Sequence, residues 1–281
     1  MKTNITFLFD NGRRTVLMDG ADFGIIDYTG FESTDYEITT QNNINGYGAK
    51  ITRKQMLPRP LSIEFESRDF ANRAAIRQDL IGFFAPYGAG TLTVSHMGTV
   101  RKIDYEVQKL LLSSKNVNNY LSGLVELTCV DPAFLAECAT SEQISTWIGG
   151  WQWKFSLPFS FRQKGEPRKP VENNGHIDIP VQIEFHGPAT NPAVYNLDSG
   201  EHIRIMADLA KGEVLYINTD FGKKSVNIDR NGIVEDASPL IDLDSRFFWL
   251  APGINMIEYT TENEQDPQRV LINRIERYSG I

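Results

Sequence analysis

The sequence predicts a mainly β protein built from two domains, with one helix in the first domain. The chain has 281 residues, a length that suits one large or two ordinary domains. Apolar and polar residues alternate over most of it, as they do in strands with one buried face. In the second half, turn sequences interrupt this alternation at a spacing of roughly 8–12 residues, which is typical of an antiparallel sandwich.

The composition excludes several classes of protein. With 41% apolar and 11% aromatic residues, the chain is too hydrophobic to be disordered. Two cysteines, Cys129 and Cys138, are too few for a disulfide scaffold, so we expect free thiols, with Cys129 buried in a strand. The net charge of −8, from 28 basic and 36 acidic residues, argues against a main role in binding nucleic acid. We find no secretory signal and no membrane-spanning stretch, and we expect the protein to begin in a cytosol.

The first strands and a long polar excursion shape the first domain. Asn11-Gly12 is a strong hairpin signal because both residues tolerate positive φ. After the next strand pattern, Thr39–Lys50 turns polar and contains glycines, and Ile51–Pro60 is basic. Long excursions of this kind in a compact domain usually serve a function. We therefore expect Glu37–Pro60 to form a protruding arm or long hairpin.

One amphipathic helix is predicted over residues 69–84. Its apolar arc comprises Phe70, Ala74, Ile76, Leu80, Ile81, Phe83 and Phe84. Arg73 and Arg77 also fall inside this arc, one turn apart, where like charges are unfavourable unless they are paired. Either their aliphatic stems pass the edge of the core, or they meet carboxylates across a subunit contact, with Glu64 and Glu66 as candidates.

A domain boundary is expected near residue 139. Asp131-Pro132 ends the last strand of the first region, and the segment 139–145 is small and polar. We therefore predict two domains, 1–138 and 139–281.

The second domain opens with an alternating aromatic row. Its members are Trp151, Trp153, Phe155, Leu157, Phe159 and Phe161. Such a row can stack on sugars, but it is more often the inner face of a sandwich strand. Ile177–Phe185 repeats the pattern, with Pro180 on the polar face, which indicates an edge strand or a bulge. Further strands are expected at 203–206, 214–218, 226–229, 247–250, 255–260 and 270–278.

Signatures of catalysis are missing from the sequence. It contains no GxSxG, HExxH, CxxC, P-loop or GxGxxG motif. The four histidines are scattered, so a shared metal is not expected. Asp242 and Asp244 form a DxD pair, but nothing near them in the sequence would raise a carboxylate pKa. We therefore expect no enzyme, no catalytic or metal-binding residue and no cofactor.

A series of short motifs gives the second half a distinctive order. They are His186-Gly187-Pro188-Ala189, Asn191–Asn196, Gly200–Ile203, Lys211–Thr219, Val226 with Asn231-Gly232, Phe248–Leu250, Pro252–Asn255 and Arg277–Ile281. In this order they resemble the distal tail proteins of long-tailed bacteriophages, the siphophage-type family of tail baseplate hubs. The first half is similar more loosely, through Arg59–Ile63 and Asp131–Phe134.

The resemblance implies a structural hub of the virion tail, assembled in the bacterial host cytoplasm. It implies an N-terminal tail-tube-like β domain that closes into a homohexameric ring, with a belt-like arm that clasps the neighbouring subunit. It also implies a C-terminal galectin-like antiparallel β-sandwich that offers attachment points for receptor-binding or fibre proteins. The ring would join the tail tube protein to the tail tip hub protein.

DNA would pass through the lumen of such a ring without specific binding. The near-neutral first half, with 14 basic and 16 acidic residues in 1–140, suits that role because basic contacts to phosphates add affinity. Galectin sugar chemistry does not carry over, since the chain has no HxNPR-type run and Trp249 lacks a following Gly-x-Glu.

The predicted arm lies where such a belt would lie. We therefore expect subunit contacts on the arm and at the helix arginines. The candidate interface residues are Tyr36, Ile38, Tyr47, Ile51, Arg53, Lys54, Met56, Arg73 and Arg77.

Two other classes of function remain as alternatives. The chain could be a lectin-like module of a tail tip that binds cell-wall carbohydrate through Trp147, Trp151 or Trp153, which would require these side chains to be exposed. It could also be a wall hydrolase, although no nucleophile–base or metal spacing supports that.

Overall fold

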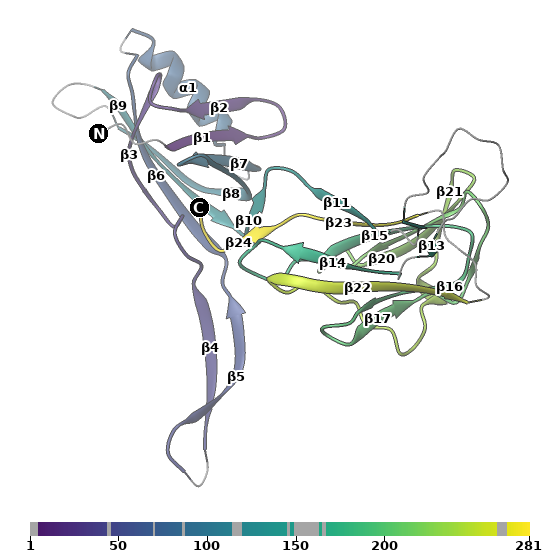
Figure 1. Ribbon diagram of the computed structural model, residues 1–281. Coiled ribbons are helices and arrows are strands. Elements are labelled where there is room, and N and C mark those ends of the chain that lie inside the picture. Colours follow the sequence, from purple (N-terminus) through teal and green to yellow (C-terminus); the bar gives the residue numbers. More distant parts are fainter. Residues whose placement is uncertain are drawn as a thin grey trace. The chain divides into compact units, whose positions relative to one another are not determined.

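The chain folds into two compact units. The computed structural model describes residues 5–43, 46–69, 71–85, 88–113, 120–144, 147–148, 163–164, 167–262 and 269–281 (Figure 1). Unit 1 consists of Met1–Glu137 and Arg277–Ile281, and unit 2 consists of Cys138–Glu276. The predicted second domain, 139–281, is therefore too long. Its last five residues belong to unit 1, because β24 (Arg277–Tyr278) pairs with β10 (Phe134–Ala136).

Unit 1 is built on a nine-stranded antiparallel sheet. Seven strands follow the order β2-β1-β7-β8-β9-β6-β3, and β10 joins β24 to β8. The seven strands are β1 (Ile5–Asp10), β2 (Thr15–Met18), β3 (Phe23–Thr29), β6 (Arg59–Ser67), β7 (Ala89–His96), β8 (Thr99–Ser113) and β9 (Leu121–Cys129). The predicted β1–β2 hairpin turns at Asn11-Gly12, where Gly12 has a φ of 76°.

The core of unit 1 comes from alternate residues of these strands. Its largest fully buried side chains include Phe7, Phe9, Phe31, Phe65 and Phe134. Cys129 is also fully buried, as predicted for a small apolar residue of a strand. Alternation therefore selected the buried face correctly, since successive side chains of a strand point to opposite faces.

The helix α1 (Arg73–Phe83) buries a narrower stripe than predicted. Leu80 and Phe83 are buried, and Ile76 packs beside them at helical spacing. Ile81 is 41% exposed and Ala74 is exposed, whereas Phe70 lies outside the described residues. A helical wheel drawn over 69–84 overestimates the width of the buried apolar arc. The helix begins only at Arg73, and only one stripe of α1 reaches the sheet.

A separate two-stranded sheet forms the predicted arm. It pairs β4 (Tyr36–Asn42) with β5 (Ala49–Met56) (Figure 1). The predicted range, 37–60, extends too far, because Arg59 and Pro60 are already the first residues of β6. Arg59 is 3% exposed and lies opposite Cys129 in the main sheet.

Unit 2 contains two antiparallel sheets that share one core. The first has six strands in the order β11-β23-β15-β19-β20-β21, and the second has five, β14-β22-β16-β17 with β18 beside β16. The strands of the first are β11 (Thr140–Ile144), β15 (Val181–His186), β19 (Val214–Asn218), β20 (Ser225–Arg230), β21 (Ile233–Asp236) and β23 (Arg269–Arg274). Those of the second are β14 (Arg168–Asn173), β16 (Ala189–Asn196), β17 (Glu201–Arg204), β18 (Asp208–Leu209) and β22 (Gly253–Glu262). A short pair, β12 (Trp147–Ile148) and β13 (Gln163–Lys164), stands apart, and η1 (Ser238–Leu240) is a 3-10 turn.

Two strand predictions in unit 2 need correction. The strand predicted over 177–185 begins only at Val181, and Ile179 forms a single bridge to Leu250. Pro180 lacks the N–H that would continue the ladder, and β15 lies inside the sheet between β19 and β23. The strand predicted over 247–250 is reduced to the same bridge at Leu250. The aromatic row at 151–161 lies outside the described residues.

The predicted class, a mainly β fold with one α-helix, is confirmed for the part of the chain that the structure describes. Within those same ranges, no helix is both long and apolar enough to cross a membrane.

Candidate assembly interface

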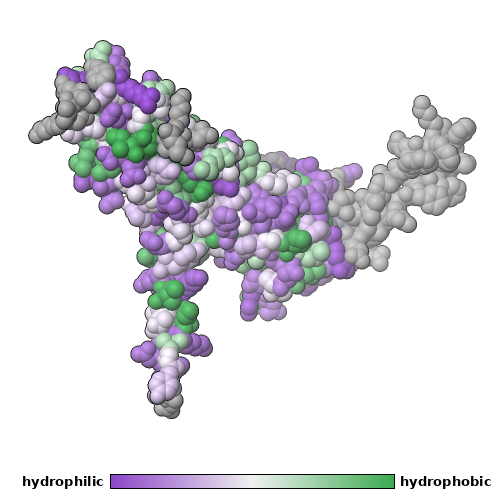
Figure 2. Space-filling model, turned by 60° about the vertical axis from the view of Figure 1, so that its left-hand side comes forward, coloured by the Kyte–Doolittle hydropathy of each residue, from purple (hydrophilic) through white to green (hydrophobic). Residues whose placement is uncertain are grey.

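The arm presents one apolar face and one polar face. Cross-strand partners share a face, so Tyr36 with Met56, and Ile38 with Lys54, lie on the same side as Ile51. Tyr36, Ile38 and Ile51 are 40%, 51% and 58% exposed, and every residue of β4 is exposed. Figure 2 shows these apolar patches along the arm between hydrophilic stretches.

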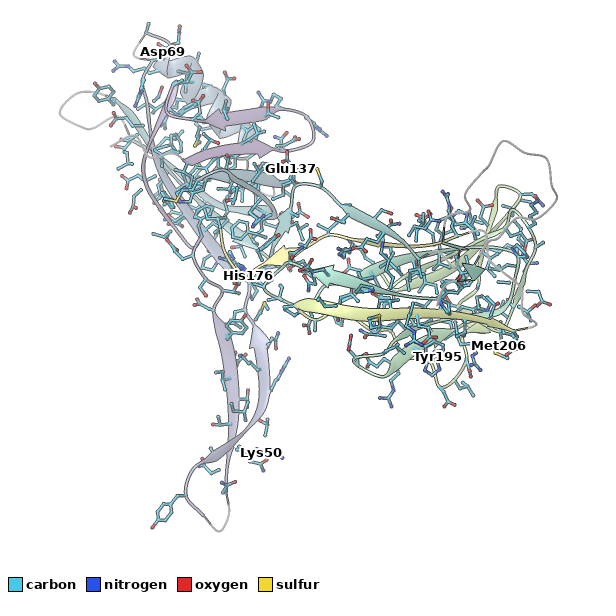
Figure 3. All side chains as sticks on the ribbon, in the orientation of Figure 1. Lys50, Asp69, Glu137, His176, Tyr195 and Met206 are labelled. Atoms are coloured by element: carbon cyan, nitrogen blue, oxygen red, sulfur yellow. The ribbon has the colours of Figure 1, made fainter. Side chains whose placement is uncertain are left out.

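Basic side chains dominate the charge of the arm. The two strands contain three basic residues, Lys50, Arg53 and Lys54, and one acidic residue, Glu37. Lys54 Nζ lies 4.9 Å from the centre of the Tyr36 ring, so its stem covers part of the apolar face. Figure 3 shows the arm's side chains, including Lys50, extending into open space. Tyr47, beside the tip, is fully exposed.

Seven of the nine predicted interface residues therefore lie together on the arm. Arg73 and Arg77 lie on α1 instead, and both are exposed. Arg77 Nη1 donates a hydrogen bond to the Leu112 backbone oxygen at 3.3 Å. A pairing of either arginine with a carboxylate across a subunit contact stays a prediction.

Arg59 forms the root of the arm and was not recognised in the sequence as a site residue. Its Nε donates to the Pro132 oxygen at 2.8 Å, and Nη1 donates to the Gly30 oxygen at 2.6 Å. Nη2 donates to Thr34 Oγ1 at 2.6 Å and to the Ser279 oxygen at 2.5 Å. Burial lowers the pKa of Arg59, but a guanidinium still keeps its charge at physiological pH.

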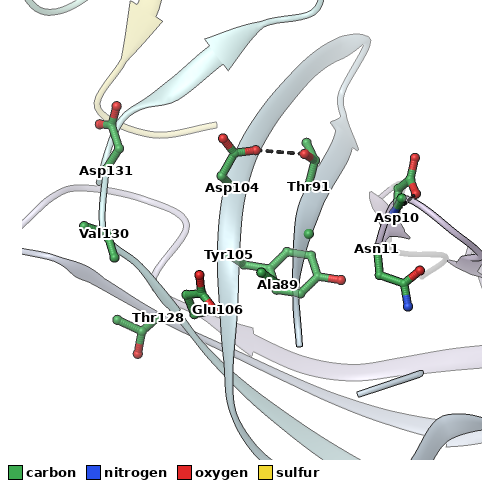
Figure 4. Close-up of a pocket in the computed structure, with 12 residues that line it drawn as sticks. Asp10, Asn11, Ala89, Thr91, Asp104, Tyr105, Glu106, Thr128, Val130 and Asp131 are labelled. Carbon is green, nitrogen blue, oxygen red and sulfur yellow. Dashed lines mark hydrogen bonds between the residues drawn. The ribbon is translucent and has the colours of Figure 1, made fainter. Parts of the chain in front are cut away.

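Unit 1 also carries an acidic groove of about 650 Å³. Figure 4 shows it at the ends of β1, β7 and β9 and along β8. Its walls carry four carboxylates, those of Asp10, Asp104, Glu106 and Asp131, and no basic side chain. Thr91 Oγ1 donates to Asp104 Oδ1 at 2.8 Å, and Arg277 pairs with Asp131. Burial, with a smaller contribution from Asp10, raises the pKa of Tyr105 in this wall to about 12.

The remaining titratable groups form no reactive constellation in the described ranges. No group of three or more His, Cys, Asp or Glu residues there could hold a metal ion. Cys129 and Cys138 are both free, and burial raises the pKa of the Cys129 thiol to about 12. Trp151 and Trp153 lie outside the described residues, as does the side chain of Trp147, so no structural observation favours the lectin-like alternative.

Comparison with known protein families bears on the second half of the chain. Residues 174–278 match the family of the siphovirus-type tail component, C-terminal domain. This segment is therefore similar to a siphophage tail component domain. No curated protein matches the sequence.

Solved phage structures extend the similarity in fold to the whole chain. The crystal structure of the SPP1 Dit protein (gp 19.1), a paradigm of the hub adsorption apparatus of phages that infect Gram-positive bacteria, matches with a TM-score of 0.68. That match covers 97% of this chain and 98% of the SPP1 chain at 14% identity. A chain of the phage P2 baseplate, activated with Ca, matches over 99% of both chains with a TM-score of 0.51 and 12% identity. The Sr form of the p2 baseplate gives a TM-score of 0.52 and the same 12% identity.

The predicted resemblance to siphophage distal tail proteins is therefore confirmed. Residues 174–278 are similar to the C-terminal domain of the siphovirus-type tail component, and the whole chain is similar in fold to the SPP1 Dit protein. These findings support a phage tail and baseplate role, and with it a location in the virion tail.

Proposed function

We propose that this protein is the distal tail protein of a siphophage-type tail, and that it assembles as a hexameric ring joining the tail tube to the tip complex. The observation that supports this most directly is the arm. A hairpin of two strands is marginally stable in water by itself, and this one leaves a row of large apolar side chains uncovered. A neighbouring subunit that covers this row would remove the free-energy cost of exposing these side chains to water.

Covering the apolar row of the arm would contribute appreciably to assembly. About half of the area of Tyr36, Ile38 and Ile51, and a smaller share of that of Met56, is still to be buried. Burying it would contribute roughly 3–6 kcal/mol per arm. In a closed ring each subunit gives one arm and receives one, so this contribution repeats at every contact.

Charge favours a second copy of the same chain as the partner. The arm carries three basic side chains against one acid, whereas the groove of unit 1 carries four carboxylates, one of which, Asp131, pairs with Arg277. Opposite potentials on two surfaces of one chain promote self-association and suppress wrong partners.

The arm can be tested with the double substitution Ile38→Ser and Ile51→Ser. We expect the hexamer fraction, measured by mass photometry at fixed concentration, to fall at least tenfold, because two central apolar contacts are lost at each interface. The matched control is Ile233→Ser with Ile254→Ser, two isoleucines of unit 2 that are 65% and 70% exposed. Equal hexamer fractions in the two variants, or a wild-type chain that stays monomeric, would contradict the proposal.

The attachment role belongs to the same proposal. We propose that the ring binds the tail tube protein and the tail tip hub protein, that unit 2 carries receptor-binding or fibre proteins, and that its sandwich is galectin-like. DNA would pass the lumen without specific binding. Mixing wild-type rings with purified tube and tip proteins should give stacked complexes in electron micrographs. The arm variant should give none.

We also propose that the protein is structural and catalyses no reaction. Turbidity of a suspension of host cell walls should stay constant when the purified protein is added. Clearing of the suspension would return the wall hydrolase to consideration.

A further inference from the structure

The segment Arg277–Ile281 is built into unit 1, although all of unit 2 separates it from the rest of that unit in the sequence. Tyr278 pairs with Phe134, and the Arg101 guanidinium lies 3.3 Å from the centre of the Tyr278 ring. The Ile281 N–H donates to the Phe31 oxygen at 3.1 Å, and Phe31 is fully buried. The segment therefore contacts the chain just before the arm begins.

Arg59 connects this segment to both legs of the arm. Gly30 and Thr34 precede β4, and Arg59 follows β5 by three residues. The Arg59 guanidinium thus donates hydrogen bonds to the chain that leads into β4, to the Pro132 oxygen and to the Ser279 oxygen. Thr34 Oγ1 also lies 3.2 Å from the Ser279 oxygen, to which it donates. Because Arg59 is 3% exposed, no bulk water replaces a lost acceptor.

Gly280 allows the segment to approach the arm root closely. A Cβ added at residue 280 would lie 1.7 Å from the Glu32 oxygen and 2.7 Å from the Glu32 carbonyl carbon. Both atoms are backbone, so no side chain can move aside to relieve the overlap. Any residue other than glycine must push the segment away from residues 31–34.

We infer that Arg277–Ile281 is a lock that fixes the arm root, so that the arm is held ready for assembly only after the chain beyond unit 2 has docked on unit 1. This inference rests on the proposed role of the arm in ring formation. Its physical basis is that Arg59 fixes both legs of the hairpin, and that one of its acceptors, Ser279, lies beyond unit 2. A chain that has not docked this segment keeps the arm hairpin but loses the fixed direction of its root.

The lock can be tested in the full chain with Gly280→Ala. Backbone amides at residues 31–35 and at Leu57 and Arg59 report on the root, and they include the Leu57 N–H bonded to the Asp35 oxygen at 3.0 Å. We expect their hydrogen exchange to be at least tenfold faster in the variant, while exchange in β15 of unit 2 stays unchanged. The hexamer fraction should fall in parallel.

Two further variants keep the test interpretable. Thr34→Val preserves the shape of the side chain and removes only its hydroxyl, so it should loosen the root in the same direction without a steric clash. Gly82→Ala on α1 is the control, since an added Cβ there would meet only Arg14 Nη2 at 3.5 Å. It should leave both root exchange and assembly unchanged.

The possible outcomes separate the lock from the proposed function. Unchanged root exchange in both Gly280→Ala and Thr34→Val would overturn the lock. Faster root exchange with normal hexamers would overturn the link between the lock and assembly. A wild-type chain that never forms rings would instead overturn the proposed function, whatever the exchange data show.

Discussion

The arm and its root are neighbours in the sequence and opposites in their physical environment. Every residue of β4 is exposed, whereas Phe31, Thr34 and Arg59 beside it are 0%, 5% and 3% exposed. The arm is held together by one local ladder, while at the root Arg59 donates hydrogen bonds to three separate segments, at residues 30–34, 132 and 279. The difference teaches that a hairpin can leave its apolar face uncovered while its base is fixed by buried contacts.

The strongest test of this contrast removes a cation from each region. Arg59→Met keeps a long apolar stem but removes the donor that the oxygens of Gly30, Pro132 and Ser279 share. We expect the free energy of unfolding of unit 1 to fall by about 3–5 kcal/mol. Arg53→Met, on the exposed arm, should change it by no more than about 0.5 kcal/mol. Scanning calorimetry of both variants measures these losses of stability. Equal losses in the two variants would contradict the contrast between arm and root.

A glycine pair gives a finer comparison. Gly30 and Gly48 have nearly the same φ, 90° and 87°, but a Cβ at Gly30 would lie 2.1 Å from the Pro60 oxygen, whereas Gly48 faces open space. Gly48→Ala should cost about 1 kcal/mol from backbone strain alone. Gly30→Ala adds the overlap at the root, and we expect about 3 kcal/mol. If the two substitutions had equal effects on chemical denaturation, the root would be less closely packed than described.

Lowering the pH should destabilise unit 2 before it affects the arm root. We expect this effect to be smaller than those of the Arg59 and Gly30 substitutions. Burial raises the pKa of Glu142, but hydrogen bonds from Arg274 at 2.7 Å and Lys169 outweigh it and hold the pKa below its usual value. A carboxylate with a lowered folded-state pKa stabilises above its unfolded pKa, and this stability is lost as pH falls through the folded pKa. Unit 2 should therefore weaken in acid before exchange at the root changes.

Glu142→Gln provides the control for the acid experiment. It should reduce the pH dependence of the unit 2 transition, measured by calorimetry between about pH 6 and pH 3. A slope equal to that of the wild type would show that other carboxylates cause the acid sensitivity.

Sequence patterns predicted those features of the fold that depend on neighbouring residues. Alternation identified the buried face of β6 and β9, and Asn11-Gly12 identified the first hairpin, because both depend on residues next to each other. The arm was predicted as well, since its polar, glycine-containing stretch has no alternation that could join a core. Its residues Tyr36, Ile38 and Ile51 are exposed together on one face, although their partner stays a prediction.

The root could not be predicted in the same way. In the sequence, Arg59 follows Arg53 and Lys54 in one basic stretch, and its place at the start of the motif Arg59–Ile63 does not indicate that it is buried. Its acceptors lie at residues 30, 34, 132 and 279, so its burial depends on contacts up to 220 positions away. Gly280 looked like part of a terminal motif, and only the position of the Glu32 oxygen shows why a side chain cannot stand there.

The double connection between the units has a mechanical consequence. The chain passes from unit 1 to unit 2 at Glu137–Cys138 and returns at Glu276–Arg277. A force applied to unit 2 is therefore shared by two peptide connections, and one of them ends in the segment that holds the arm root. A single cut in either connection would leave unit 2 attached, but a cut after Glu276 would also separate the segment at the arm root from the pull. Part of any load on unit 2 therefore passes through the same five residues that contact the arm root.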